Sequence, residues 1–133
     1  MALRSDGQVF VVGAGGLGED EVPPLPTGLS YTAMAAGGAF SLLLRSDGQA
    51  FGFGYDYYGQ STVPELPEGV TYTGVAAGTY HSVFLRSDGT AISVGYFAGD
   101  PEYDVPELPA GVKYVGVSAG IASTILLTEA VSP

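Results

Sequence analysis

A unit of about 41 residues occurs three times in this chain of 133 residues, and three separate landmarks mark each copy. The landmarks are Leu-Arg-Ser-Asp-Gly at residues 3–7, 44–48 and 85–89, Val-Pro-x-Leu-Pro-x-Gly at residues 22–28, 63–69 and 105–111, and Tyr-x-x-apolar-x-Ala-Gly at residues 31–37, 72–78 and 114–120. All three keep spacings of 41 or 42 residues, and the additional residue of the last interval falls in the loop around residues 96–104. Such a period is typical of repeat folds, in which each unit buries its apolar face against its neighbours.

Each unit predicts a set of short antiparallel strands. We expect strands at residues 72–77, 82–86 and 90–95, with Ser87-Asp88-Gly89 as the tight turn between the last two. Asp-Gly between apolar runs is a strong hairpin signal, because glycine adopts positive φ without steric cost. The segment 105–109 is expected to be an edge strand or an extended connector, because its prolines cannot donate to a ladder. The 21 glycines and 9 prolines disfavour helices. The sequence therefore predicts an all-β fold with three or four strands per repeat.

The charge balance limits the kinds of partner that the chain can bind. It has 14 acidic residues against 4 basic ones, a formal net charge of −10. Nucleic acids and anionic membrane surfaces both attract Lys and Arg side chains, so we expect neither as a partner. No apolar stretch reaches the length of a membrane helix, and residues 1–7 lack the apolar core of a signal peptide. We expect one soluble domain, and the sequence assigns it no compartment.

The residue inventory gives little support for catalysis, a cofactor or a metal site. The chain has no cysteine, and a lone histidine such as His81 is normally a packing or hydrogen-bonding residue. Residues 13–18 match Gly-x-Gly-x-x-Gly, but the acidic, proline-containing segment 19–24 follows where a nucleotide site requires a helix. No pair of titratable groups recurs with a convincing acid–base environment. We therefore predict that the chain is not an enzyme and carries no cofactor.

Tyrosines and acids gather in the loops between repeats and form the candidate protein-binding surface. Its members are Tyr55, Asp56, Tyr57, Tyr58, Tyr96, Phe97, Asp100, Glu102, Tyr103 and Asp104. Tyrosine is favoured at recognition surfaces because it offers a large contact area at low rotamer cost, and a basic protein would match the acids. The alternative is that these tyrosines cover neighbouring units. The alternating acids 100, 102 and 104 could suggest calcium, but Pro101 intervenes and no glycine occupies the turn, so an acidic rim in solvent is the simpler interpretation.

The sequence of residues 75–90, Val-Ala-Ala-Gly-Thr-Tyr-His-Ser-Val-Phe-Leu-Arg-Ser-Asp-Gly-Thr, resembles the repeat of the regulator of chromosome condensation family. Residues 54–60 resemble the glycine, polar loop and Gly-Gln that continue that repeat. In place of the family's His-Ser pair, the other copies have Phe-Ser at 40–41 and Ser-Thr at 123–124. Where the family usually has tryptophan, this chain has Val12, Phe53 and Val94. The resemblance implies a β-propeller, commonly seven-bladed, that serves as a binding platform, and it implies a structural role for His81.

The phase of the repeat predicts how the units are completed. The chain has a half-blade at residues 1–30, full repeats at about 31–71 and 72–113, and a half-blade at 114–133. Three blades are too few for a ring, since propellers have about four to eight. Pairing the half-blades of two chains would give a six-bladed ring with two-fold symmetry and would hide the open sheet edges. We therefore predict a homodimeric propeller of four-stranded blades that acts as a non-enzymatic binding scaffold.

Two other interpretations fit the same repeat. The chain could be a fragment of a longer array. Three units of about 41 residues also suit a monomeric β-trefoil or β-prism, in which the aromatic and acidic loops would form a lectin-like, carbohydrate-binding module.

Overall fold

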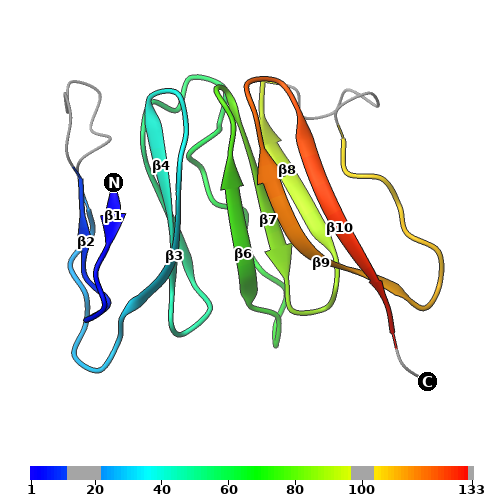
Figure 1. Ribbon diagram of the computed structural model, residues 1–133, viewed down its shortest axis with the longest axis horizontal. Coiled ribbons are helices and arrows are strands. Elements are labelled where there is room, and N and C mark those ends of the chain that lie inside the picture. The colour runs from blue at the N-terminus through cyan, green and yellow to red at the C-terminus, as the bar shows by residue number, and fades with distance from the viewer. Residues whose placement is uncertain (12–21, 97–103, 132–133) are drawn as a thin grey trace.

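The structure, a computed structural model, describes residues 1–11, 22–96 and 104–131, and these form four antiparallel sheets. The strands are β1 (Ala2–Leu3), β2 (Val9–Phe10), β3 (Tyr31–Ala36), β4 (Phe40–Arg45), β5 (Ala50–Gly54), β6 (Tyr72–Ala77), β7 (His81–Arg86), β8 (Ala91–Gly95), β9 (Val112–Ala119) and β10 (Thr124–Ala130). The sheets are β1–β2, β3–β4–β5, β6–β7–β8 and β9–β10. They stand side by side in chain order, with the two chain ends at opposite ends of the row (Figure 1).

The observed strands follow the expected repeat closely. Strand β6 has the expected bounds, β7 begins one residue earlier than expected and β8 one residue later. The four-stranded blade is not observed: within the described residues the fullest sheets have three strands, and segments 63–67 and 105–109 run outside any ladder. The prolines of these segments have no amide hydrogen to donate, so extended connectors replace a fourth strand.

The middle strands of the two complete sheets form the core. Leu42 and Leu43 of β4 and Val83 and Phe84 of β7 are fully buried. These strands are paired on both edges and covered on both faces by neighbouring sheets, so every residue of their apolar runs is inside rather than every second one. Burial of such side chains contributes about 1.5–3 kcal/mol each.

A buried tyrosine at or near the start of β3, β6 and β9 ties the preceding proline connector to its sheet. The hydroxyl of Tyr31 donates to the carbonyl oxygen of Pro23 at 2.5 Å, and that of Tyr114 donates to Pro106 at 2.5 Å. The hydroxyl of Tyr72 donates to Pro64 in the same way. The strand register shifts directly after each of these tyrosines. The shift is a β-bulge that recurs in all three units.

Backbone hydrogen bonds join each Asp-Gly turn to the next unit. The amide of each first-strand tyrosine donates to the carbonyl oxygen of the preceding turn glycine: Tyr31 to Gly7 at 2.9 Å, Tyr72 to Gly48 at 2.8 Å and Tyr114 to Gly89 at 2.9 Å. These glycines have φ between 81° and 85°, a conformation that other residues rarely adopt. The Asp-Gly motif thus makes both the hairpin and the contact between sheets.

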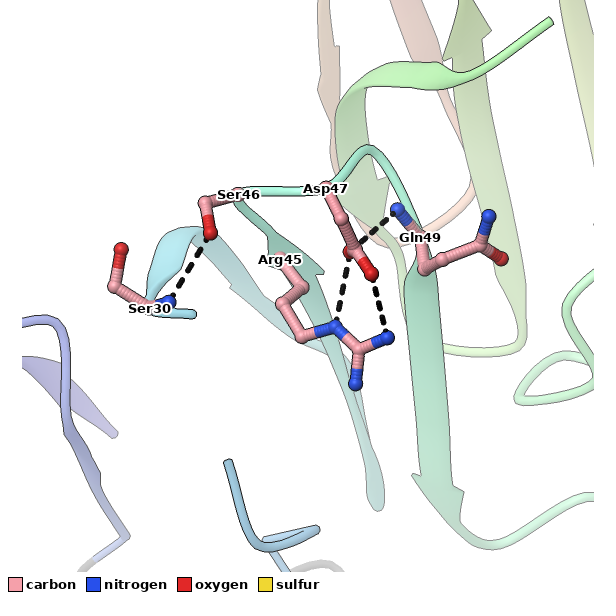
Figure 2. Close-up of polar contacts among 5 residues, drawn as sticks. All are labelled: Ser30, Arg45, Ser46, Asp47 and Gln49. Carbon is pink, nitrogen blue, oxygen red and sulfur yellow. Dashed lines mark hydrogen bonds and ion pairs between the residues drawn. The ribbon is translucent and has the colours of Figure 1, made fainter. Parts of the chain in front are cut away.

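Figure 2 shows the polar contacts of the β4–β5 turn. The Arg45 guanidinium donates to both carboxylate oxygens of Asp47, at 2.9 and 2.7 Å. This hydrogen-bonded pair holds the pKa of Asp47 below its usual value. The same carboxylate accepts from the Gln49 amide at 3.3 Å, and the Ser46 hydroxyl accepts from the Ser30 amide of the preceding connector at 3.1 Å. The Leu-Arg-Ser-Asp-Gly motif is therefore a structural turn, and its serine acts as a hydrogen-bond partner.

The β-trefoil and β-prism alternatives are wrong, because each repeat forms its own small sheet and the sheets follow one another in an open row. Sheets β1–β2 and β9–β10 lie at opposite ends of that row and do not pair with each other. One chain therefore does not close a three-bladed ring. The glycine motif at residues 13–18 lies outside the described residues.

Candidate functional site

Five tyrosines from two consecutive repeats meet where β5 and β8 end. The members of this tyrosine cluster are Tyr55, Tyr57, Tyr58, Tyr80 and Tyr96. In Figure 1 the cluster belongs to the end of the sheets that carries the β6–β7 turn, opposite the Asp-Gly hairpin between β7 and β8.

Tyr58 is the centre of the cluster. Its ring centroid lies 5.0 Å from that of Tyr57, 5.6 Å from that of Tyr80 and 4.8 Å from that of Tyr96, all in edge-to-face geometry. Tyr55 and Tyr57 are nearly parallel, with an interplanar angle of 17° and centroids 6.4 Å apart. Desolvation, and then the neighbouring tyrosines, raise the pKa of Tyr58 above its ordinary value, so its phenol stays neutral at neutral pH.

Glycine before the tyrosine directs each of these two loops out of its sheet. Gly54 and Gly95 have φ of 104° and 119°, and a side chain on Gly95 would clash with the carbonyl oxygen of Tyr80. The next residues, Tyr55 and Tyr96, donate their amides to the carbonyl oxygens of residues 39 and 80, in each case at 2.9 Å. The repeat thus places a tyrosine at the same point of two adjacent sheets.

The carboxylate of Asp56 holds the loop that carries three of the tyrosines. It accepts from the Ser61 amide at 2.8 Å and from the Thr62 hydroxyl at 2.5 Å. Burial alone would raise the pKa of Asp56, but these hydrogen bonds outweigh it and hold that pKa below its usual value. The loop also turns at Gly59, where φ is 78°. Asp56 is therefore a positioning residue for the tyrosines.

Gln60 fixes the same loop to the neighbouring sheet. Its side chain is fully buried, and its carbonyl Oε1 accepts from the Tyr58 amide at 2.9 Å. Its backbone carbonyl accepts from the hydroxyl of Ser82 in β7. The loop is thus anchored at both ends, which lowers the entropic cost of presenting the rings to a partner.

The structure brings together four of the predicted surface residues, namely Tyr55, Tyr57, Tyr58 and Tyr96. The predicted members Phe97, Asp100, Glu102 and Tyr103 lie outside the described residues. Asp104 lines a different hollow, beside His81 and Tyr114.

Tyr80 is a member of the cluster that the sequence pattern did not identify. It precedes His81 in the β6–β7 turn, where the other copies have Ala39 and Ala122. That departure from the repeat is the signal that could have revealed it.

The basic residues of the chain all lie at the hairpin end of the sheets. Arg4, Arg45 and Arg86 each precede an Asp-Gly turn, and Lys113 packs beside the Gly89 turn. The four account for every Lys and Arg in the sequence. The tyrosine cluster at the other end therefore has no cation of this chain beside it.

His81 is a buried contact between sheets. Its Nε2 lies 3.0 Å from the hydroxyl of Thr124 in β10, and its ring covers Gly78. Burial lowers the pKa of His81 below its ordinary value. Within residues 1–11, 22–96 and 104–131, no three His, Asp or Glu side chains gather as a metal site would require.

A hollow of about 610 Å³ opens beside β10, and Leu126 and Thr128 contribute to its lining together with Tyr114. The other face of β10 is exposed, and Ile125 and Leu127 are 70% and 63% accessible to solvent. No described segment pairs with the outer edge of this strand. In the described part of the chain, no helix is long and apolar enough to cross a membrane.

Comparisons with known proteins identify one repeat type and a similar fold. Residues 31–60 match the family model of the regulator of chromosome condensation (RCC1) repeat. No curated protein matches the sequence. The fold is similar to yeast RCC1 (Prp20) in its structure with Kap60, with a TM-score of 0.68 and 22% identity over 94% of this chain and 38% of that chain.

Two further structures show the same likeness. Prp20p of Saccharomyces cerevisiae, described with its binding properties to Gsp1p and histones, gives a TM-score of 0.68 and 21% identity over 94% of this chain and 40% of its own. The ectodomain of the receptor kinase CR4 of Physcomitrella patens gives a TM-score of 0.65 and 20% identity, over 90% of this chain and 33% of its own. The chain spans about two-fifths or less of the length of these structures. Residues 31–60 thus match one repeat of the regulator of chromosome condensation family, and the fold of the chain is similar to that of the β-propellers of yeast RCC1.

Proposed function

We propose that the chain is a non-enzymatic propeller scaffold that binds proteins through two surfaces. One is the open edge of β10, which takes a second copy of the chain and thereby completes a ring. The other is the tyrosine cluster, which receives a different protein. The blades of this scaffold are residues 31–71 and 72–113, and the segments 1–30 and 114–133 are the half-blades that two copies complete.

The contrast between β10 and its equivalents carries this proposal. Leu127 corresponds in register to Leu44 of β4 and Leu85 of β7, because each pairs with the residue two places after the first-strand tyrosine. Leu44 and Leu85 are 6% and 4% exposed, whereas Leu127 is 63% exposed. Strand β10 thus has the composition of a middle strand, but it lacks both the third strand that pairs with its equivalents and a following sheet like the one that covers Leu44. Covering it with a matching strand would stabilise the assembly by about 25 cal/mol for each Å² of apolar surface removed from water.

Strand β2 of a second copy is the matching strand. Within the complete sheets, Leu44 pairs with Ala50 and Leu85 pairs with Ala91, and Val9 is the residue of β2 at this repeat position. In the chain itself Val9 pairs with Leu3 of β1, a strand of two residues. We infer that β10 of one copy replaces the short β1 on β2 of the other, with Leu127 opposite Val9 of the partner.

A disulfide between these positions tests the register. The sequence contains no cysteine, so a variant with Val9→Cys and Leu127→Cys has only the designed pair. Neighbouring antiparallel residues have Cα atoms about 4.5–5.5 Å apart, within the range of a disulfide. Mild oxidation is expected to give a covalent dimer with two links. The matched control is Val9→Cys with Glu129→Cys, which displaces the second thiol by two residues along β10. Equal cross-linking of the two variants, or none in either, would contradict the proposed pairing.

The protein-binding role of the tyrosine cluster has independent support. Tyr57 and Tyr58 are exposed on a loop held in place by Asp56 and Gln60, and the exposed Tyr80 and Tyr96 lie against Tyr58. Aromatic residues on a rigid loop are typical of binding hot spots. The yeast protein of similar fold has a structure in complex with Kap60 and described binding to Gsp1p and histones, which are protein partners.

A further inference from the structure

We propose that the tyrosine cluster binds the guanidinium group of arginine side chains in a basic protein segment. This inference rests on the proposed protein-binding function and adds the chemical group that the cluster recognises.

The ring faces of the cluster are suited to a cation. The face of an aromatic ring carries negative electrostatic potential, and a guanidinium placed over it is attracted within about 6 Å of the centroid. Tyr57 is 79% exposed, and its edge-to-face contact with Tyr58 on one side leaves much of the ring in solvent. A partner side chain can therefore reach a ring face without any rearrangement of the loop.

The flat ring faces favour a planar cation over a compact one. Tyr55 and Tyr57 are within 17° of parallel, with centroids 6.4 Å apart, so their faces have nearly the same orientation. A planar guanidinium can lie flat against such a face, whereas the lysine ammonium cannot and also holds its hydration shell more strongly.

The chain itself stacks arginine on aromatic rings at its other end. The Arg45 guanidinium lies 4.7 Å from the ring centroid of Phe51, and that of Arg4 lies 5.3 Å from the centroid of Phe10. The tyrosine cluster offers the same kind of ring without any of the four basic residues of the chain nearby. With a net charge of −10, the protein also attracts basic segments at long range.

Binding of short labelled peptides tests the proposal. The probes are a peptide of alternating arginine and glycine and the same peptide with lysine or with neutral citrulline in place of arginine. Fluorescence anisotropy is measured at about 0.15 M salt, where the Debye length is about 8 Å and general charge attraction is weak. The arginine peptide is expected to bind on the order of tenfold more tightly than either analogue. If the lysine peptide bound as tightly as the arginine peptide, the attraction would come from net charge alone. If the citrulline peptide bound as tightly, the contact would be stacking without charge. Either result overturns the proposal.

Substitutions locate the site. Tyr57→Ala is expected to weaken binding of the arginine peptide on the order of fivefold to tenfold, whereas Tyr57→Phe keeps the ring and should change it less than about twofold. Met34→Ala, at an exposed apolar side chain of β3, is the control and should have no effect. Unchanged affinity in Tyr57→Ala, or a glycan bound in place of the arginine peptide, would refute the arginine site. Such a failure would leave the β10 pairing intact, since cysteine cross-linking tests that separately.

Discussion

Removal of one hydroxyl group, in Tyr72→Phe, tests how the proline connectors are held to the sheets. Tyr72, the first residue of β6, is buried in the core between the two complete sheets, and its ring packs on Phe84 with centroids 5.2 Å apart. Its hydroxyl donates to the carbonyl oxygen of Pro64 and interacts with the Arg86 guanidinium. Phenylalanine keeps the packing and removes both polar contacts.

The size of the effect follows from these two contacts. The hydrogen bond to Pro64 contributes about 0.5–1.5 kcal/mol, and the attraction of the Arg86 charge adds to it. The free energy of unfolding of Tyr72→Phe is therefore expected to fall by about 1–2 kcal/mol. Tyr31→Phe in the preceding repeat loses the hydrogen bond to Pro23, so we expect a smaller loss of about 1 kcal/mol.

Urea unfolding followed by circular dichroism measures both losses. For a chain of this size, 2 kcal/mol corresponds to a decrease of about 1 M in the urea midpoint with an unchanged slope. All variants are compared at one protein concentration, because self-association adds to stability. Tyr80→Phe is the control, since Tyr80 is half exposed and should change stability by less than about 0.5 kcal/mol. Equal losses in Tyr72→Phe and Tyr80→Phe would refute the role assigned to the connector bond.

Three further substitutions test other parts of the structure. Burial keeps the pKa of His81 in the folded chain below 6.5, so the unfolded chain takes up the proton first as the pH falls. The contribution of His81 to the free energy of unfolding is therefore complete above pH 6.5 and falls as the pH drops below that value. His81→Phe should remove this pH dependence in urea titrations between pH 5 and 8. Gly95→Ala places a methyl group against the backbone of Tyr80 and should lower the free energy of unfolding by about 2 kcal/mol or more in thermal melts. Asp56→Ala removes the bonds to Ser61 and Thr62, so it should weaken peptide binding several-fold by loosening the loop and lower the free energy of unfolding by about 1–2 kcal/mol.

Much of the fold could be predicted from the sequence, because each landmark of the repeat has one direct physical reason. Asp-Gly gives a hairpin since glycine accepts positive φ, and the observed turns at Gly48 and Gly89 confirm it. The number of strands per blade was harder to predict. Whether segment 63–67 joins a ladder depends on a tertiary contact, namely the bond from Tyr72 to Pro64, and composition alone does not show it.

The candidate site was predicted in part for a similar reason. The tyrosines at 55, 57, 58 and 96 were conspicuous as an aromatic run on loops, and the structure places them together. Tyr80 is separated from them in sequence and enters the cluster only because adjacent sheets bring the β6–β7 turn to Tyr58. Asp56 was grouped with the binding residues, yet its carboxylate is directed into its own loop, since the amide of Ser61 lies within hydrogen-bonding reach.

The mass of the unmodified chain in solution tests the proposed assembly most directly. Sedimentation equilibrium at several concentrations should give twice the chain mass of 13.6 kDa, because β10 exposes a middle strand that a second copy can cover. Leu127→Lys should shift the same measurement to a single chain by placing a charge in the paired edge. A mass of 13.6 kDa for the unmodified chain at every concentration would contradict the ring of two copies.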